Sequence, residues 1–452
     1  ITKLKKVLNF ILPKNSFRRK IVKYILKPKE LFDEIEYRLL LTSSLKLKKK
    51  NNKIKTIKKI LVLTPYYPTM GGGEKEMAYF CKYFENRFKE AKIDLLVFNF
   101  ANYDVFSDSY PDITELNKRF NINLERSSLL KIRLDKNKNW KIRELKNKLM
   151  IEKLTKKYDI FLNFMFLSNH RGLAKFNLYR TMFPVEKMSY SYIDDYNIKN
   201  ILDTNYIEVY DFFISNSNFT NYWHSKFWDK NEKNITIYPP VFSESEINGR
   251  YIKENKKNII LSVGRFQVGG HNKKQDRMVD FFINNYESLR GFEYHIVGGM
   301  PEDQDTKNFV ENIRSKIGNF PVFLHINCPY AELINLYEKA KIFWHATGFE
   351  ENENKNPEKM EHFGITTVEA MSYGVIPVVI NKGGQPEIID HGNNGFLWNN
   401  ESECIEHTIR VIGNDVLRDQ MALKATQRAY DFSIEEFYNK NKEIIDKLLK
   451  IW

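Results

Sequence analysis

Cysteine is scarce in this chain of 452 residues, which contains three: Cys81, Cys328 and Cys404. An odd, sparse set argues against a disulfide framework and predicts a reducing compartment, which we take to be the cytoplasm. No apolar run in the sequence reaches the roughly 18 residues typical of a membrane span. No secretory signal is visible, and because the first residue is isoleucine we expect the chain to be a piece of a longer protein.

A basic surface is also missing from most of the chain. Residues 1–59 contain 19 Lys and Arg against 4 Asp and Glu, whereas the whole chain contains 71 against 57. The remaining residues therefore carry 52 basic and 53 acidic side chains and are close to neutral. Because binding to a phosphate backbone needs a basic face, we expect no nucleic-acid partner for the main body.

The basic segment 1–56 is expected to form a helical extension and a linker. Residues 17–27 (FRRKIVKYILK) place apolar side chains near one helical face, and residues 45–55 (LKLKKKNNKIK) resemble a solvated linker. Two interpretations stay open. The segment is either a connection to an upstream domain, or a peripheral contact with the anionic cytoplasmic face of a membrane through residues 1–55.

The rest of the chain reads as two α/β units. Short continuous apolar runs, typical of buried parallel strands, alternate with stretches of helical periodicity from Ile57 onward. This alternation predicts two Rossmann-like, doubly wound parallel sheets that face each other across a cleft. We expect four segments: the extension (1–56), an acceptor-side domain (57–243), a donor domain (244–432) and a C-terminal helix that crosses back to the first domain (433–452).

Each unit opens with a glycine-containing turn after its first strand, where doubly wound sheets place their ligands. The turn Gly71-Gly72-Gly73 lets backbone amides approach a phosphate or sugar closely, although a plain flexible turn is the alternative. In GRFQVGGHNKKQ, Arg265 and Lys273 lie eight residues apart across a glycine pair. A guanidinium and an ammonium that converge from one loop suit a diphosphate. Lys273 and Lys274 are hard to separate, and we favour Lys273.

The stretch EHFGITTVEAM (361–371) separates Glu361 and Glu369 by eight positions. Thr366 and Glu369 have the spacing of a capping box, which predicts that a helix starts at Thr366. The loop around Gly364 then leads into a helix N-terminus, which favours an anion. Carboxylates accept hydrogen bonds from hydroxyl groups, so the two acids suit the sugar and the ribose of a nucleotide sugar.

At this point the sequence resembles the retaining glycosyltransferases of family 4, which have the GT-B fold and an E-x7-E signature. The stretch EHFGITTVE matches the signature, and the GGGE loop, GRF…HNKKQ, WHATGFE and EAMSYGVIPVVINKGGQPEIIDHGNNGFLW follow the family order. The resemblance spans roughly residues 57–452. Parts are also similar to the mannosyltransferases that extend lipid-linked oligosaccharides, which implies a glycan or lipid-linked acceptor.

The resemblance implies a hexosyltransferase that uses a nucleotide diphosphate sugar, retains the anomeric configuration and serves polysaccharide or cell-surface glycan synthesis. Attack would come from the same face, with the leaving phosphate as base. Arg265 and Lys273 would neutralise the leaving diphosphate, and Glu361 would hold a hydroxyl of the transferred sugar. The implied donor-binding positions are Gly72, Gly73, Lys274, Phe363, Gly364, Ile365 and Glu369, the last of which would bind the ribose.

The acceptor side departs from the family. Many relatives carry a histidine in a segment comparable to RTMFPVE, where this chain has Met182, and His170 is a candidate substitute or a surface histidine. No cofactor and no metal are expected, because fixed cations take the metal's role in this family. Asp194 and Asp195 are expected at the surface, His345 is expected to be structural, and residues 350–359 are expected to form a mobile or solvated loop.

Two other functions remain open. The same fold also serves GT-B nucleotide-sugar epimerases, and the chain could instead be a non-catalytic binding domain of a larger glycan-assembly protein.

Overall fold

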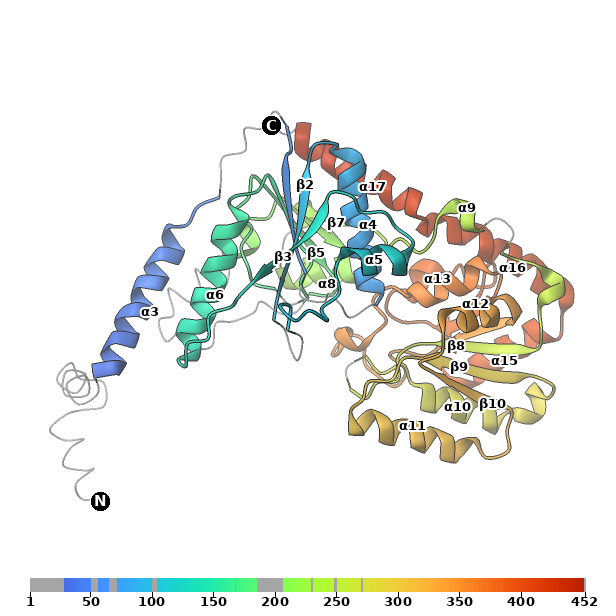
Figure 1. The fold of residues 1–452 in the computed structure, drawn as a ribbon. Coiled ribbons are helices and arrows are strands. Elements are labelled where there is room, and N and C mark those ends of the chain that lie inside the picture. Colours follow the sequence, from blue (N-terminus) through green and yellow to red (C-terminus); the bar gives the residue numbers. More distant parts are fainter. Residues whose placement is uncertain are drawn as a thin grey trace, which may run out of the picture.

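The computed structural model describes residues 28–49, 56–64, 71–99, 104–166, 168–184, 206–228, 231–247, 250–269 and 271–450. They form two α/β units, each built on a twisted sheet with helices on its faces (Figure 1). All strand pairings of both sheets are parallel. The predicted doubly wound α/β class is therefore confirmed, while the exact domain limits stay a prediction.

The first sheet has seven strands in the order β3-β2-β1-β4-β5-β6-β7. Consecutive strands β1 to β3 run outward on one side and β4 to β7 on the other, so the winding direction changes between β1 and β4. Such a switch point opens a crevice at the carboxyl ends of the strands. The strands are β1 (Lys59–Leu63), β2 (Lys92–Phe98), β3 (Ser127–Ile132), β4 (Ile160–Asn163), β5 (Phe176–Thr181), β6 (Phe212–Ser215) and β7 (Asn234–Thr236).

The second sheet has six strands in the order β10-β9-β8-β11-β12-β13, with its switch point between β8 and β11. The central strands are buried on both faces, as their continuous apolar sequences predict. The strands are β8 (Ile259–Val263), β9 (Glu293–Gly298), β10 (Val322–Ile326), β11 (Ile342–His345), β12 (Ile376–Ile380) and β13 (Phe396–Trp398).

Helices connect successive strands and cover both sheets. Those of the first unit are α3 (Pro28–Lys46), α4 (Gly72–Arg87), α5 (Ile113–Phe120), α6 (Trp140–Thr155) and α8 (Asn218–Trp228). Those that follow are α9 (Glu244–Ile247), α10 (Gln275–Asn284), α11 (Gln304–Ile317), α12 (Tyr330–Lys339), α13 (Ile365–Ser372), α14 (Gln385–Ile388), α15 (Glu401–Ile412), α16 (Asp415–Ala429) and α17 (Ile434–Lys450).

Two passages of the chain connect the units, and they run side by side. Phe242 on the first passage forms a parallel bridge with Ser433 on the second, with Ile434 N donating to Phe242 O at 2.8 Å. After the second passage, α17 packs on α4, where the rings of Phe80 and Phe437 lie 4.8 Å apart (Figure 1). The last helix therefore completes the core of the first unit.

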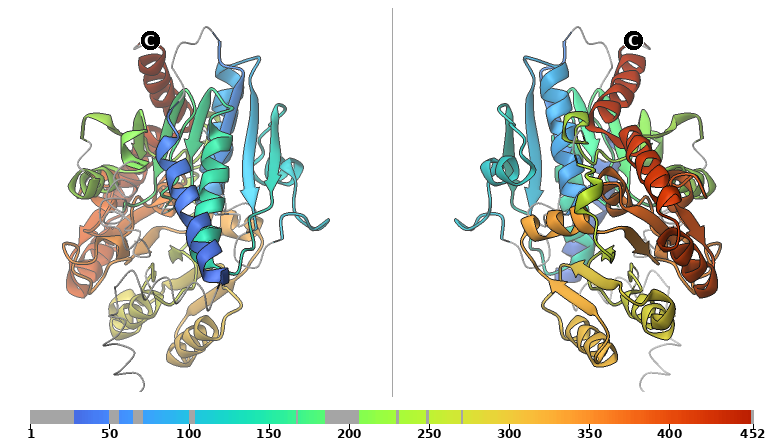
Figure 2. Two further views of the ribbon diagram at one scale, coloured as in Figure 1. Left: turned by 90° about the vertical axis from the view of Figure 1, so that its left-hand side faces the viewer. Right: turned by 90° about the vertical axis from the view of Figure 1, so that its right-hand side faces the viewer.

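Helix α3 belongs to the same unit. It lies alongside α6, as the left view of Figure 2 shows. The buried guanidinium of Arg171 donates to the carbonyl and hydroxyl oxygens of Ser44 at 3.0 and 2.9 Å, which fixes the C-terminal end of α3. None of the helices in the described ranges is long and apolar enough to cross a membrane. The expected amphipathic segment 17–27, most of the linker 45–55 and the pair Asp194-Asp195 lie outside the described residues.

Candidate active site

Glu361 lies at the switch point of the second sheet, between residues from two different strands. Its Oε2 accepts from Lys273 Nζ at 2.5 Å and from His345 Nε2 at 3.1 Å. Lys273 comes from the loop after β8, and His345 is the last residue of β11. The switch-point geometry therefore brings together a carboxylate (Glu361), an ammonium group (Lys273) and an imidazole (His345) from different segments of the sequence.

The charge state of this group follows from its surroundings. The side chains of Lys273 and Glu361 are 21% and 17% exposed. Burial opposes ionisation of Glu361, but the Lys273 ammonium and the hydrogen bond from His345 outweigh it and hold the pKa of Glu361 well below its usual range. Burial lowers the pKa of His345, so its imidazole is neutral at neutral pH. If Nε2 donates to Glu361, Nδ1 accepts from Gln385 Nε2, which lies 3.4 Å away.

The other cations of the same loop have different surroundings. Lys274 Nζ lies 3.3 Å from Glu351 Oε1, in the acidic loop 350–359, and so turns away from Glu361. Arg265 is exposed, and no acidic partner is recorded for it within the described residues. In the described residues Lys273 is therefore paired with Glu361 and Lys274 with Glu351, while Arg265 has no acidic partner.

The acidic loop 350–359 is anchored over this region. Glu351 also accepts from Lys359 Nζ at 3.0 Å, and Glu353 accepts from the Gly383 amide at 2.9 Å. Arg277 of α10 pairs with Glu350 at 3.1 Å. Several ion pairs and hydrogen bonds hold this loop, and half of its residues are exposed, as expected for a solvated loop; its mobility stays a prediction.

The start of α13 differs from the prediction. The helix begins at Ile365, and its N-cap is Gly364, without a side-chain cap. The predicted capping box of Thr366 and Glu369 is therefore wrong. The reason is that Gly364 adopts φ +121°, so that the N-cap lies two residues before the predicted Thr366. Glu369 accepts from Tyr337 OH at 3.1 Å instead.

The glycine turn of the first unit meets the start of α13. Gly72 is the first residue of α4, and a Cβ atom added there would lie 2.7 Å from Ile365 Cδ1. A Cβ atom at Gly73 would lie 3.7 Å from Met182 Cε. The absence of a side chain at Gly72 therefore allows two helix N-termini, α4 and α13, to approach each other from different units.

Aromatic side chains close the contact between the units beside Glu361. The His362 imidazole stacks on Phe183 of the first unit, with ring centres 4.3 Å apart, and His271 meets it edge-on at 4.5 Å. Burial lowers the pKa of both histidines, so both are neutral at neutral pH. The ring of Phe363 is buried and stacks on Tyr238, so only its backbone is available to a ligand.

The two acceptor-side candidates lie in different places. Met182 lies beside Gly73, next to the contact between the units. His170 lies near a buried ion network in which Glu152 pairs with Arg171 and Lys148, and burial lowers the pKa of His170 to about 3. No recorded contact joins His170 to Glu361 within the described residues.

Sequence reasoning missed part of this group. His345 was expected to be structural, and the roles of His271, His362 and Gln385 were not anticipated. The fold supplies their contacts: it brings His345 to Glu361, Gln385 to His345, and the rings of His271 and Phe183 to His362. The motifs WHATG and EHFG did carry a signal, because each ends a buried strand or starts a helix with a polar side chain at the carboxyl edge of the sheet.

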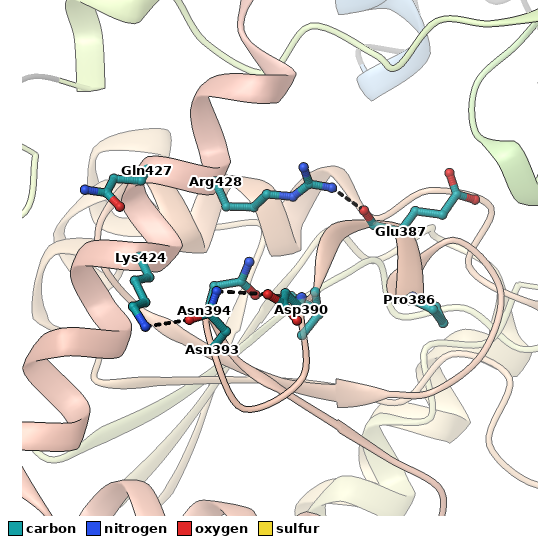
Figure 3. Close-up of a pocket in the computed structure, with 9 residues that line it drawn as sticks. Pro386, Glu387, Asp390, Asn393, Asn394, Lys424, Gln427 and Arg428 are labelled. Carbon is teal, nitrogen blue, oxygen red and sulfur yellow. Dashed lines mark hydrogen bonds between the residues drawn. The ribbon is translucent and has the colours of Figure 1, made fainter.

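No group of three or more His, Cys, Asp or Glu side chains in the described part of the chain is arranged to hold a metal ion. A separate polar pocket lies between the segment 386–394 and α16 (Figure 3). Both cationic side chains of this pocket already have hydrogen-bond partners in the protein: Lys424 donates to Asn393, and Arg428 donates to two backbone carbonyls.

Two parallel-sheet α/β units, joined by two adjacent passages of the chain, have the architecture of the GT-B fold. Known structures support this class. A glycosyltransferase from Rickettsia africae superposes with a TM-score of 0.61 at 19% identity, covering 88% of this chain and all of that one. Anabaena Alr3699/HepE in complex with UDP and glucose gives 0.61 at 16% identity, covering 86% of this chain and all of that one. The predicted GT-B fold is confirmed.

The sequence of the second unit is similar to that of known proteins. Residues 243–428 match the family described as Glycosyl transferases group 1. The GDP-Man:Man(3)GlcNAc(2)-PP-Dol alpha-1,2-mannosyltransferase of Dictyostelium discoideum is 27% identical over 47% of this chain and 42% of its own length. The human protein of the same name is 25% identical over 53% and 49%. The chain thus spans about half, or less, of the curated relatives it matches.

Proposed function

We propose that this protein is a retaining glycosyltransferase that moves a hexose from a nucleotide diphosphate sugar to a glycan or lipid-linked acceptor. The observation that carries the proposal is the pair Lys273–Glu361 at 2.5 Å, placed where the start of α13 meets the glycine turn of the first unit. The names of the relatives make GDP-mannose the first donor to test and a lipid pyrophosphate oligosaccharide the first acceptor. UDP-sugars come next, since HepE was solved with UDP and glucose.

In the proposed reaction, the bond between the sugar C1 and the diphosphate oxygen breaks while a bond from C1 to an acceptor hydroxyl forms on the same face. The acceptor proton ends on the leaving diphosphate. Negative charge grows on that group in the transition state, and Arg265, Lys273 and the amides at the starts of α4 and α13 supply fixed positive charge for it. Glu361 accepts a hydrogen bond from a sugar hydroxyl, and Glu369 accepts from the ribose. We propose no metal and no cofactor for this step.

The test is turnover measured with GDP-, UDP-, dTDP- and ADP-sugars, after a thermal-shift screen to select the donor. A transferase releases nucleotide and forms a glycosylated acceptor, whereas an epimerase returns an isomerised nucleotide sugar. Glu361→Gln preserves shape and removes the charge, and we expect it to lower kcat by about 10²-fold, the usual effect of losing one fixed contact to the transition state. Nucleotide binding without turnover in the native chain would favour a non-catalytic binding domain, and native turnover of Glu361→Gln would contradict the role proposed for Glu361.

A second part of the proposal concerns location. We propose that α3, together with the basic residues around it, makes a peripheral contact with the cytoplasmic face of a membrane. On α3, Phe32, Ile35 and Leu39 share one face and are 69%, 46% and 63% exposed, while Arg171 holds the opposite side of the helix. The test is co-sedimentation with anionic and zwitterionic vesicles. Phe32→Ser with Leu39→Ser should reduce binding, and Leu423→Ser, at an exposed leucine of α16, should not.

A further inference from the structure

One carboxylate connects the two units directly. Glu387 belongs to α14 of the second unit, and it accepts from the backbone amides of Asn218 and Phe219 at 2.7 and 2.5 Å. These two residues start α8 of the first unit. A carboxylate at a helix N-terminus satisfies free amides and interacts favourably with the helix dipole. In Figure 3 the side chain of Glu387 points away from the pocket, while its backbone carbonyl accepts from Arg428.

Tyr238 reinforces this connection from the first passage between the units. Its hydroxyl donates to Glu387 Oε2 at 3.0 Å and lies 2.9 Å from Asn218 Nδ2, which donates to it. The ring of Tyr238 stacks on Phe363 with centres 5.3 Å apart, and Phe432 of the second passage packs edge-on against both rings. The two passages and the loop of Glu361 therefore share one aromatic cluster.

The segment that carries Glu387 also rests on the backbone of Glu361. The Gly384 amide donates to the Glu361 carbonyl at 2.8 Å, and a Cβ atom at Gly384 would lie 2.5 Å from the His362 carbonyl. Residues 384–387 thus touch the Glu361 loop at one end and the first unit at the other. A displacement of α8 relative to α14 would be transmitted to the backbone that holds Glu361.

The donors around Glu387 are present only while the units lie together. Burial raises the pKa of Glu387, and three hydrogen-bond donors from the first unit and the connecting segment offset part of that rise. If the units separate, the carboxylate exchanges these donors for water, and α8 loses the partner of its first amides. The contact therefore specifies one relative placement of the units, because its hydrogen bonds need α8 and α14 in one position.

We propose that Glu387 is a positioning residue that couples the relative placement of the two units to the loop of Glu361, and thereby to donor binding. The inference rests on the proposed function, because it assigns Glu387 a role in the use of a nucleotide sugar. It predicts that loss of the contact lowers the fraction of molecules ready to bind donor, which raises the apparent dissociation constant by that fraction.

The experiment uses the full chain with Glu387→Gln, Tyr238→Phe and the double variant, and with Glu406→Gln as control. Glu406 is an exposed acid of α15 in the same unit. Hydrogen exchange at the amides of Asn218 and Phe219 and the radius of gyration from small-angle scattering report the contact itself. KM and kcat for the donor, and the Kd of GDP and UDP by calorimetry, report its effect on the site.

For Glu387→Gln we expect exchange at both amides and KM for the donor each to rise about tenfold, with kcat within about twofold of the native value. Tyr238→Phe should give a smaller change in the same direction, and the double variant should show less than the sum, because both act on one contact. Loss of fold alone would instead lower kcat through the active fraction and leave KM unchanged.

The inference is overturned if exchange at the two amides is native in both single variants, or if kcat falls while KM stays constant. Should Glu387→Gln not fold, Tyr238→Phe decides, since it removes one hydroxyl and keeps the ring stack. Failure of the proposed function has a different result, because the native chain would then turn over no nucleotide sugar. Hydrogen exchange, small-angle scattering and the nucleotide Kd would still test the contact in that case.

Discussion

Replacing Lys273 by methionine is the sharpest test of the site. Methionine keeps an unbranched side chain one atom shorter than that of lysine and removes the charge that lies 2.5 Å from Glu361. At that distance, Coulomb's law with an effective dielectric constant of 20 gives a gross attraction of roughly 7 kcal/mol. Desolvation of both groups cancels much of it, which leaves a net effect of about 2–4 kcal/mol, similar to the loss of an oxyanion-hole donor.

We therefore expect Lys273→Met to lower kcat by about 10²–10³-fold, because the same ammonium is proposed to face the leaving diphosphate. The pKa of Glu361 should also rise, since burial is no longer opposed by the neighbouring cation. The acidic limb of the pH–rate profile should then move to higher pH. Steady-state kinetics between pH 4 and 9, with the donor identified by thermal shift, measures both effects.

Lys274→Met is the matched control, since it removes an adjacent cation that pairs with Glu351 instead. We expect a loss in kcat of no more than about fivefold, in keeping with the modest worth of a partly exposed ion pair. Equal losses in the two variants would refute the assignment of Lys273, because the effect would then come from the total charge of the loop. A Lys273→Met enzyme with half of the native kcat would refute it as well.

Three further predictions concern stability. Gly364→Ala should lower the free energy of unfolding by about 1–3 kcal/mol, because φ is +121° and the new Cβ would lie 2.7 Å from Gln385 Nε2. The control is Gly291→Ala, which has φ +87° but open space around the new Cβ and should lower the free energy of unfolding by less. Chemical denaturation measures both. Arg171→Met should lower the free energy of unfolding by about 3–5 kcal/mol, because the buried Glu152 carboxylate loses one of its cationic partners. Proteolysis near residue 46 should also become faster, because α3 loses the hydrogen bonds between Arg171 and Ser44. An unchanged rate of cleavage there would contradict the anchoring role. Burial opposes ionisation of Glu152, but its cationic partners outweigh burial and lower the pKa to about 2. The shift contributes about 3 kcal/mol to the free energy of unfolding above pH 4.5, and this contribution is lost as the pH falls toward 2. Urea denaturation of Glu152→Gln at a series of pH values should lack this acid dependence.

Strands with a continuous apolar run are predictable from the sequence, and strands in which polar residues interrupt that run are not. The runs that begin β1, β8 and β12 stand out because both faces of each strand are buried. β5 has no such run because Asn177 and Arg180 interrupt its apolar pattern; each is buried and hydrogen-bonded, which no local signal reveals. β3, partly exposed along most of its length, and the three-residue β13 also lack a sufficiently long apolar pattern.

For the site, the sequence identified residue types better than partners. Lys273 was preferred over Lys274, yet only the assembled sheet shows that the two lysines face different acids, Glu361 and Glu351. The capping-box prediction failed because a glycine with positive φ competes for the helix start, and the φ angle of a glycine is not encoded by its immediate neighbours.

The neighbouring bridge between Phe242 and Ser433 has a consequence for exchanging parts of this protein. Since α17 packs on α4, the second unit is topologically an insertion into the first, entered and left through two adjacent points of one backbone ladder. The second unit of a relative could replace the native one between those two points, and the chimaera would keep the native final helix α17. Chimaeras cut at a single junction would instead pair a foreign final helix with the native α4 and should lose core packing there.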